Sequence, residues 1–202
     1  MNQILAFTLA YFIGNISPAL ILMRLLKGGD IRQHGSGNPG AANTNLLLGP
    51  KVGAAVLILD ILKGAMGVLV GLWIGGSIGG LLGALGVIIG HNWPILLGFR
   101  GGKGISATAG ALIVLFPVVF TILIAVLGLT ILITRYASIG FMAALIALPI
   151  VLFLFNHTNP EIITGTAITA MGLLRYKDNI RLLLQGKETK MGQGAVFHDE
   201  DK

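Results

Sequence analysis

The sequence predicts an all-α integral membrane protein that crosses the bilayer about seven times. Of its 202 residues, 54% are hydrophobic and only 11% are charged, whereas soluble domains carry about a quarter charged residues. The apolar residues gather in stretches of the length that a spanning helix needs, roughly 20 residues. The 30 glycines are typical of packed transmembrane helices, in which small residues let backbones approach one another.

Hydropathy gives six apolar stretches along the chain. They lie near 3–26, 52–74, 77–97, 105–134, 137–155 and 160–174. The fourth would be about 45 Å long as one helix, which exceeds a hydrocarbon core of about 30 Å. Because Pro117 lies near its middle and breaks helices, we expect two short crossings there, 104–116 and 118–134. This division raises the count to seven.

Basic residues predict the orientation of these crossings. Lysine and arginine are absent from the connections near 74–77, 117 and 156–160, but they flank the other connections and fill the C-terminal segment. Since basic loops favour the cytoplasm, seven crossings place the N-terminus outside and the C-terminus in the cytoplasm. We expect one membrane domain over 1–192, a short disordered cytoplasmic tail over 193–202, and a retained first span rather than a cleaved signal peptide.

Composition argues against several classes of function. The chain has no cysteine, so it has no disulfide framework and no thiolate nucleophile. Its cations neither line one element nor alternate with stacking aromatics, which argues against nucleic-acid binding. The four histidines lack paired ligand spacing, so no metal site is predicted.

Three polar islands interrupt the apolar pattern, at 30–45, 90–104 and 175–188, and the predicted topology places all three on the cytoplasmic face. The first contains GSGNPG at 35–40, which matches G-x-G-x-x-G. That pattern indicates dinucleotide binding only inside a strand–turn–helix unit, and a membrane span precedes it here. Its glycine amides can still cradle an anion; the alternative is a tight turn. Asn38, Asn43 and Asn45 favour a polar ligand.

The second island ends in Gly101, Gly102, Lys103 and Gly104, preceded by Arg100. It is not a Walker A loop, because Gly104 stands where the Mg²⁺-binding Ser or Thr would be. The loop opens a helix, whose N-terminal end attracts anions. A phosphate or acyl phosphate site is one interpretation; ordinary positive charge beside a membrane is the other.

Ionisable residues also lie within the predicted spans. His91 stands in the last turns of the third span, where a histidine is a functional candidate, although it can also be structural. Asp60 and Lys63 are three residues apart on one helix and can pair. A structural pair and a role in the site both remain open.

Taken together, the islands resemble those of the bacterial acyl-phosphate:glycerol-3-phosphate acyltransferases, the PlsY family. The matching segments are GSGNPGAANTN at 35–45, LDILKG at 59–64, GHNWPILLGFRGGKG at 90–104 and RYKDNIRLLLQGKE at 175–188. Their order and spacing match over nearly the whole chain, and the second island is the most specific.

The resemblance implies a multi-pass enzyme of the bacterial inner membrane. It would move a fatty acyl group from acyl phosphate to the sn-1 hydroxyl of glycerol 3-phosphate, without a cofactor or metal, and release lysophosphatidic acid and phosphate. Ser36, His91 and Lys103 would take part in catalysis. Substrate would be bound by Gly37, Asn38, Asn43, Arg100, Gly101, Gly102, Gly104, Asn179, Arg181 and Glu188.

The chain departs from the family pattern at four positions. Leu46 and Leu182 stand where the family usually has arginine, Tyr176 where it has histidine, and Ala107 where threonine is common. Leucine cannot replace the bidentate phosphate contacts of arginine, although Arg181 is adjacent to one of these positions. Two alternatives therefore accompany the main hypothesis: a divergent member with another hydroxyl acceptor, and a small transporter or scaffold without chemistry.

Overall fold

The structure is a computed structural model that describes residues 1–191, which contain helices and no strand. The helices of this region are α1 (Asn2–Asn15), α2 (Pro18–Leu26), α3 (Ala41–Leu48), α4 (Pro50–Asn92), α5 (Ile105–Leu115), α6 (Pro117–Thr134), α7 (Ala137–Leu154), α8 (Asn159–Arg175) and α9 (Lys177–Leu184). The predicted tail at 193–202 lies outside the described residues.

Several helical stretches of the described chain have the length and composition of membrane spans. Four are long and apolar enough to cross a bilayer: Asn2–Leu26, Pro50–Leu97, Pro117–Thr134 and Ala137–Leu154. A shorter apolar helix covers Ile105–Leu115. The fold class is therefore an all-helical membrane protein. The count of seven crossings and the side of each terminus stay predictions.

Helix α4 is a hairpin of two antiparallel arms, 50–75 and 77–92, rather than one rod. The chain reverses at Gly76, whose φ of 62° and ψ of −153° are open to glycine but not to residues with a Cβ atom. The arms pack closely because small residues face each other: a methyl group on Gly71 would overlap the backbone carbonyl of Gly79. The turn predicted between two spans near 74–77 is thus present.

The first apolar stretch is broken, which the hydropathy pattern did not predict. Helix α1 ends at Asn15 and α2 begins at Pro18, with Ser17 in an extended conformation between them. Proline has no N–H to continue a helix, and the Ser17 hydroxyl accepts a hydrogen bond from the Leu20 amide at 3.4 Å. Pro18 is therefore a helix start, and the segment bends at Ile16.

The long stretch after residue 104 divides where proline predicts. Helix α5 ends at Leu115, Phe116 has non-helical φ and ψ values of −141° and 64°, and Pro117 is the first residue of α6. Two separate helices, rather than one of about 45 Å, therefore occupy this region.

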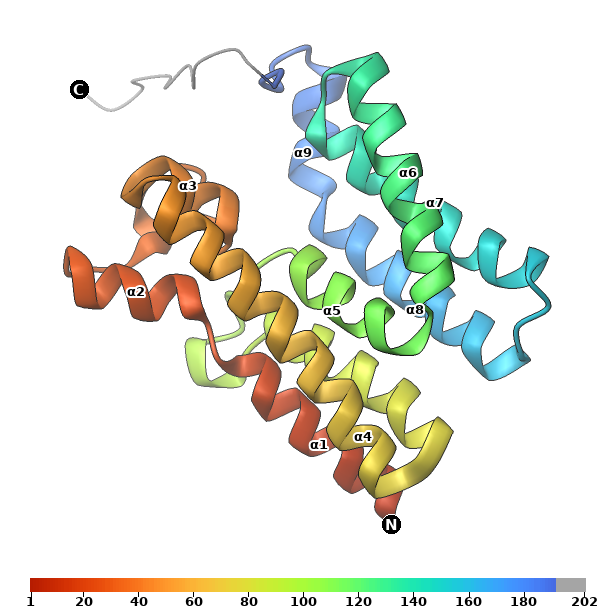
Figure 1. Ribbon diagram of the computed structural model, residues 1–202. Helices are drawn as coiled ribbons and strands as arrows, with labels where there is room; N and C mark the ends of the chain where they lie inside the picture. The colour runs from red at the N-terminus through yellow and green to blue at the C-terminus, as the bar shows by residue number, and fades with distance from the viewer. Residues whose placement is uncertain (192–202) are drawn as a thin grey trace, which may run out of the picture.

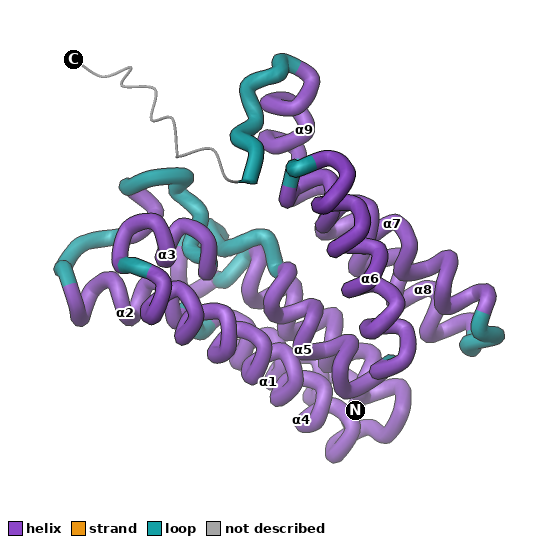
Figure 2. The backbone as a smooth tube through the Cα atoms, turned by 45° about the horizontal axis from the view of Figure 1, so that its top comes forward, coloured by secondary structure: helices purple, strands orange, loops and turns teal. Residues whose placement is uncertain are grey.

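The helices form a bundle built around the α4 hairpin (Figure 1). Helix α1 packs on the second arm, where a methyl group on Gly90 would overlap the carbonyl of Tyr11, and α5 packs on the first arm through Gly64 and Gly110. Helices α6, α7 and α8 form a second group beside α5. The tube view shows α3, α9 and their loops at the end of the bundle away from the N-terminus (Figure 2). The polar islands thus gather at one end.

Candidate active site

A cavity lies between the polar end of the bundle and the helices α5, α6 and α7. This main cavity has a volume of about 780 Å³. Its polar lining comes from the three sequence islands and includes Ser36, Asn38, His91, Lys103 and Asn179. Its apolar lining comes from the helices and includes Leu112, Leu123, Leu127, Phe141 and Leu148. One continuous space therefore joins a polar, cationic region to an apolar groove.

Asn43 organises the first island. It is buried on α3; its amide group donates to the His34 carbonyl at 3.0 Å, and its side-chain oxygen accepts from the Ser36 amide at 3.0 Å. Gly35, with a φ of 59°, lets the chain turn between these two contacts. Asn43 therefore holds the loop that presents Ser36 and Asn38 to the main cavity.

Lys103 joins the second island to the third. Its ammonium group donates a hydrogen bond to the side-chain oxygen of Asn179 and lies 4.7 Å from the ring centre of Tyr176, a favourable cation–π distance. Asn179 in turn donates to Glu188 at 2.8 Å. Burial lowers the pKa of Lys103, and the negative charge of Glu188 opposes that shift. Among the described residues lining the main cavity, Lys103 is the single lysine or arginine.

His91 lies where the α4 hairpin meets the glycine-rich loop. It is buried; its backbone carbonyl accepts from the Gly102 amide at 3.0 Å, and its Nδ1 lies 3.5 Å from Asp60 Oδ1. Asp60 also pairs with Lys63 at 2.7 Å. The Asp60–Lys63 contact was expected, whereas the approach of His91 was not. Asp60 and His91 lie about equally far from Gly76 along the chain. A hairpin that turns at Gly76 would bring them to the same level, so the predicted turn near 74–77 was the signal that could have revealed this contact.

A second space, which we call the loop cavity, lies between the first and second islands. Its volume is about 400 Å³, and its lining is Asp30, Arg32, Gln33, Gly37, Phe99, Arg100, Gly101 and Arg175. Two of its three arginines hold the backbone. Arg175 donates to the carbonyls of Gly102 at 2.9 Å and Gly101 at 2.6 Å. These bonds fix the loop that carries Lys103.

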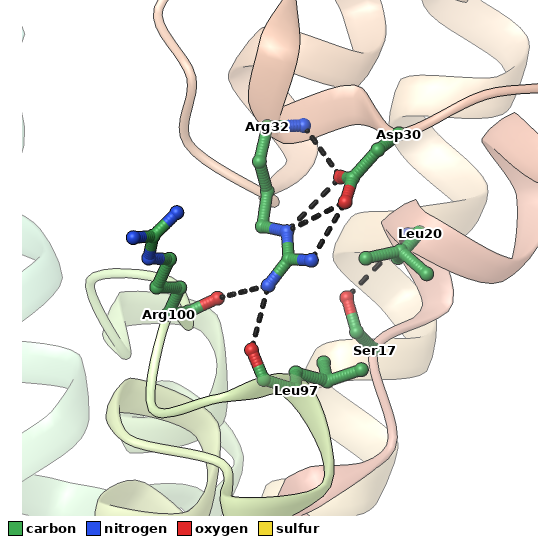
Figure 3. A network of polar contacts seen from close by, with 6 residues as sticks. All are labelled: Ser17, Leu20, Asp30, Arg32, Leu97 and Arg100. Carbon is green, nitrogen blue, oxygen red and sulfur yellow. Dashed lines mark hydrogen bonds and ion pairs between the residues drawn. The ribbon is translucent and has the colours of Figure 1, made fainter.

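Arg32, which also lines the loop cavity, binds backbone carbonyls as Arg175 does; its contacts are drawn in Figure 3. Its guanidinium group pairs with Asp30 at 2.6 Å and donates to the carbonyls of Leu97 at 2.8 Å and Arg100 at 3.2 Å. Hydrogen bonding from Arg32 lowers the pKa of the Asp30 carboxyl. Arg32 therefore ties the first island to the second.

The residues named from the sequence fall into three groups. Those on the main cavity are Ser36, Asn38, Asn43, His91, Lys103, Gly104, Asn179 and Glu188. Those on the loop cavity are Gly37, Arg100 and Gly101. Gly102 binds Arg175 through its carbonyl, and Arg181 is exposed on α9, so neither belongs to the lining of these two spaces.

The four departures from the family pattern take different places. Leu46 lines the main cavity and is 45% exposed, and Leu182 is 39% exposed on α9. Tyr176 is buried beneath Lys103, and burial raises its pKa. Ala107 is fully buried against Gly64, while its neighbour Thr108 lines the main cavity. Leu46 is the departure that places an apolar side chain where a cation was expected.

Comparison with known proteins agrees with this arrangement. Residues 4–186 match the family model described as glycerol-3-phosphate acyltransferase. The chain belongs to the glycerol-3-phosphate acyltransferase family.

Relatives in this family align with almost the full chain. The glycerol-3-phosphate acyltransferase of Thermoanaerobacter pseudethanolicus is 36% identical over 96% of this chain and 98% of the relative. That of Alkaliphilus metalliredigens is 39% identical over the same shares. These alignments therefore extend over nearly the full length of each relative.

Two solved structures share the arrangement of helices. Both are crystal structures of PlsY, an integral membrane glycerol 3-phosphate acyltransferase. The glycerol 3-phosphate form has a TM-score of 0.89 and 31% identity, and the lysophosphatidic acid form a TM-score of 0.86 and 32% identity. Each alignment covers 95% of this chain and 96% of the other. The family assignment thus holds for both sequence and fold.

Proposed function

We propose that this protein transfers a fatty acyl group from an acyl phosphate to the sn-1 hydroxyl of glycerol 3-phosphate. The single observation that carries this proposal is the composition of the main cavity. Lys103 and the polar islands line one part of it, and the apolar faces of α5, α6 and α7 line the rest. A ligand that suits such a space has an anionic head and a long apolar tail, as a fatty acyl phosphate does.

The protein has to orient the two substrates, but it does not have to activate the acyl donor. An acyl phosphate is a mixed anhydride, so the sn-1 hydroxyl oxygen attacks the carbonyl carbon, the bond from that carbon to the phosphate oxygen breaks, and phosphate leaves. The hydroxyl proton passes to a phosphate oxygen. The protein has to align the two substrates, exclude water, and stabilise the carbonyl oxyanion and the departing phosphate. No covalent enzyme intermediate is required.

The residues of the main cavity supply these functions. Lys103 places a cation beside the glycine amides of its loop, which suits the phosphate of the donor. Ser36 and Asn38 present a hydroxyl and an amide group from the opposite loop. The helices that line the apolar region are those proposed to face lipid, so the acyl chain would enter from the bilayer.

The proposed location follows from charge and hydropathy. Basic connections at the polar end of the bundle favour the cytoplasmic face of a bacterial inner membrane, with the N-terminus outside and seven crossings. Glycerol 3-phosphate is water-soluble and would reach the islands from the cytoplasm. The acyl donor would arrive within the membrane.

One observation supports a second acceptor as the alternative. Leu46 borders the main cavity, and Lys103 supplies its one lysine or arginine side chain within the described residues. Two anionic substrates would therefore share a single strong cation. An uncharged or less charged hydroxyl compound would fit this balance better than glycerol 3-phosphate does.

Purified protein in detergent or lipid vesicles tests the proposal. Palmitoyl phosphate with glycerol 3-phosphate should yield lysophosphatidic acid and phosphate in equal amounts, measured by mass spectrometry and a phosphate assay. Palmitoyl-CoA at the same concentration is the matched donor control and should yield no product.

Three other outcomes would contradict parts of it. Phosphate release without lysophosphatidic acid would indicate another acceptor or hydrolysis, which product analysis with glycerol and other alcohols would separate. Product from palmitoyl-CoA alone would overturn the donor. Absence of turnover with every donor would favour a transporter or scaffold.

A further inference from the structure

Helix α4 contains a buried ion pair between Asp60 and Lys63. Its contribution to stability does not by itself explain why the pair is present. The Asp60 side chain is 1% exposed and that of Lys63 is 8% exposed, and their charged atoms lie 2.7 Å apart. For buried pairs, the loss of hydration can exceed the attraction between the charges, so apolar residues of similar size often serve stability equally well. The position of this pair in the molecule therefore needs its own account.

Lys63 is connected to the break between α1 and α2. Its ammonium group donates a hydrogen bond to the Ile16 carbonyl at 2.7 Å. Ile16 lies just before the Pro18 helix start, and the Leu20 amide, which a continuous helix would direct to Ile16, bonds to Ser17 instead. Because a carbonyl without a partner is unfavourable in a bilayer, Lys63 anchors this break and is itself fixed there.

Asp60 is connected to the glycine-rich loop through His91. Its Oδ1 lies 3.5 Å from His91 Nδ1, and this ring nitrogen is buried without a hydrogen-bond partner among the described residues. The carboxylate is thus the charged group placed to accept a hydrogen bond from Nδ1. The other ring nitrogen faces the loop, since a methyl group on Gly102 would overlap Nε2. The Gly102 amide also donates to the His91 carbonyl at 3.0 Å. His91 is thus held between Asp60 and the loop that carries Lys103.

We propose that Asp60 is a positioning residue that fixes the tautomer and orientation of His91, with Lys63 holding Asp60 in place. The partner of one ring nitrogen sets the protonation of the other, so a carboxylate beside Nδ1 keeps the proton there. Nε2, which lies beside Gly102, then carries a free lone pair on a side chain that lines the main cavity. That lone pair accepts a hydrogen bond from the hydroxyl group in the bound substrate and orients it, before the proton passes to the phosphate oxygen.

Nuclear magnetic resonance of protein with ¹⁵N-labelled histidine tests the tautomer directly. The His91 signals are assigned by their loss in His91→Gln. We expect a protonated Nδ1 and an unprotonated Nε2 in the native protein, and a shift toward the opposite tautomer in Asp60→Asn, in which the amide can donate to Nδ1. A proton on Nε2 in the native protein would overturn the proposal.

Kinetics test the consequence of this arrangement, which rests on the proposed function. The double variant Asp60→Leu with Lys63→Met removes both charges together, so it avoids a lone buried charge. We expect its kcat to fall at least about tenfold, a smaller loss than the roughly 10⁴-fold seen when the aspartate that orients the histidine of a serine protease is replaced by asparagine. The KM for glycerol 3-phosphate should stay within about twofold of native. A native kcat in this variant would also overturn the proposal.

The protein contains a second histidine–carboxylate pair that serves as a control for the kinetic measurement. His157 Nδ1 lies 3.3 Å from Glu161 Oε2 at the start of α8, and neither residue lines the main cavity. Glu161→Gln should leave kcat unchanged. Because the tautomer is read without turnover, a protein with no transferase activity would refute the proposed function while the spectra still decide the role of Asp60. The spectra of the native protein and Asp60→Asn also decide it if the double variant does not fold.

Discussion

The two cavities differ in what their cations do. The loop cavity has three arginines, but Arg32 and Arg175 direct their guanidinium groups to Asp30 and to backbone carbonyls. Within the part of the chain that the structure describes, Lys103 is the single lysine or arginine of the main cavity, and it stands over an aromatic ring next to an apolar groove. The proposed ligand site is therefore distinguished by a cation beside apolar surface rather than by the number of its basic residues. The arginines hold the loops that present this cation.

The largest effect should come from removing a cationic side chain from the main cavity, compared with removing one from the loop cavity. Lys103→Met removes the charge from the main cavity and should lower kcat/KM about a hundredfold or more, as the loss of a donor to a developing anion does. Arg100, which the resemblance assigned to substrate binding, lies on the loop cavity instead, so Arg100→Met should change kcat/KM less than about threefold. The phosphate-release assay measures both. Equal losses would show that the two cavities are not distinct in function.

The next effect concerns the scaffold. Arg175→Lys keeps the charge but cannot reproduce the forked contact with two carbonyls, each worth about 1.5–3 kcal/mol as a charged hydrogen bond. We expect about a tenfold lower kcat/KM together with a lower melting temperature in thermal unfolding. Lys177→Arg, an exposed neighbour, should leave both unchanged. A loss of activity with unaltered unfolding would instead indicate direct contact between Arg175 and substrate.

A smaller effect should appear in the pH profile. Burial lowers the pKa of Lys103, so the ammonium form is complete at low pH and is lost as the pH rises, before an ordinary lysine at about 10.4 would lose it. kcat/KM should therefore fall on the alkaline side below that value. In Lys103→Arg this decline should move to higher pH, because guanidinium keeps its proton. An unchanged profile would assign the decline to another group.

The smallest effect should come from adding a cation to the main cavity. Leu46→Arg should lower the KM for glycerol 3-phosphate about threefold, a modest gain because the position is 45% exposed and solvent screens the contact. Leu182→Arg on α9 is the companion variant. Steady-state kinetics with varied glycerol 3-phosphate measure both. If neither variant changes this KM, the arginine positions of the family are not what limits acceptor binding here.

Sequence reasoning succeeded where one residue type fixes the local backbone. Pro117 predicted the division between α5 and α6, and the glycines near 76 lie where the α4 hairpin turns. The predicted topology placed the islands of Lys103 and Asn179 on one face of the membrane, and these two side chains are hydrogen-bonded. Such features depend on chain geometry or on the scarcity of polar groups in a membrane protein.

What sequence reasoning missed depends on register and on backbone partners. Pro18 was passed over because the hydropathy around it is continuous. The contact of Asp60 with His91 requires two arms to pair in one register, which no local pattern encodes. Arg175 binds backbone carbonyl groups. Because every residue has such a group, no sequence pattern indicates which ones Arg175 contacts. Asn43 was expected to bind substrate, which stays a prediction; the hydrogen bonds by which it also holds the loop that presents Ser36 had no signal in the sequence.

The turn at Gly76 also determines where residues could be inserted into α4 without breaking the contact between Asp60 and His91. Each arm of α4 carries one partner of a contact across the hairpin, so one inserted residue between 77 and 90 would rotate His91 by about 100° and turn it from Asp60. A matching insertion in the first arm would not restore the contact, since both faces would have rotated. We therefore expect added residues to be accommodated at the apex, 75–77, where they would alter the register of neither arm.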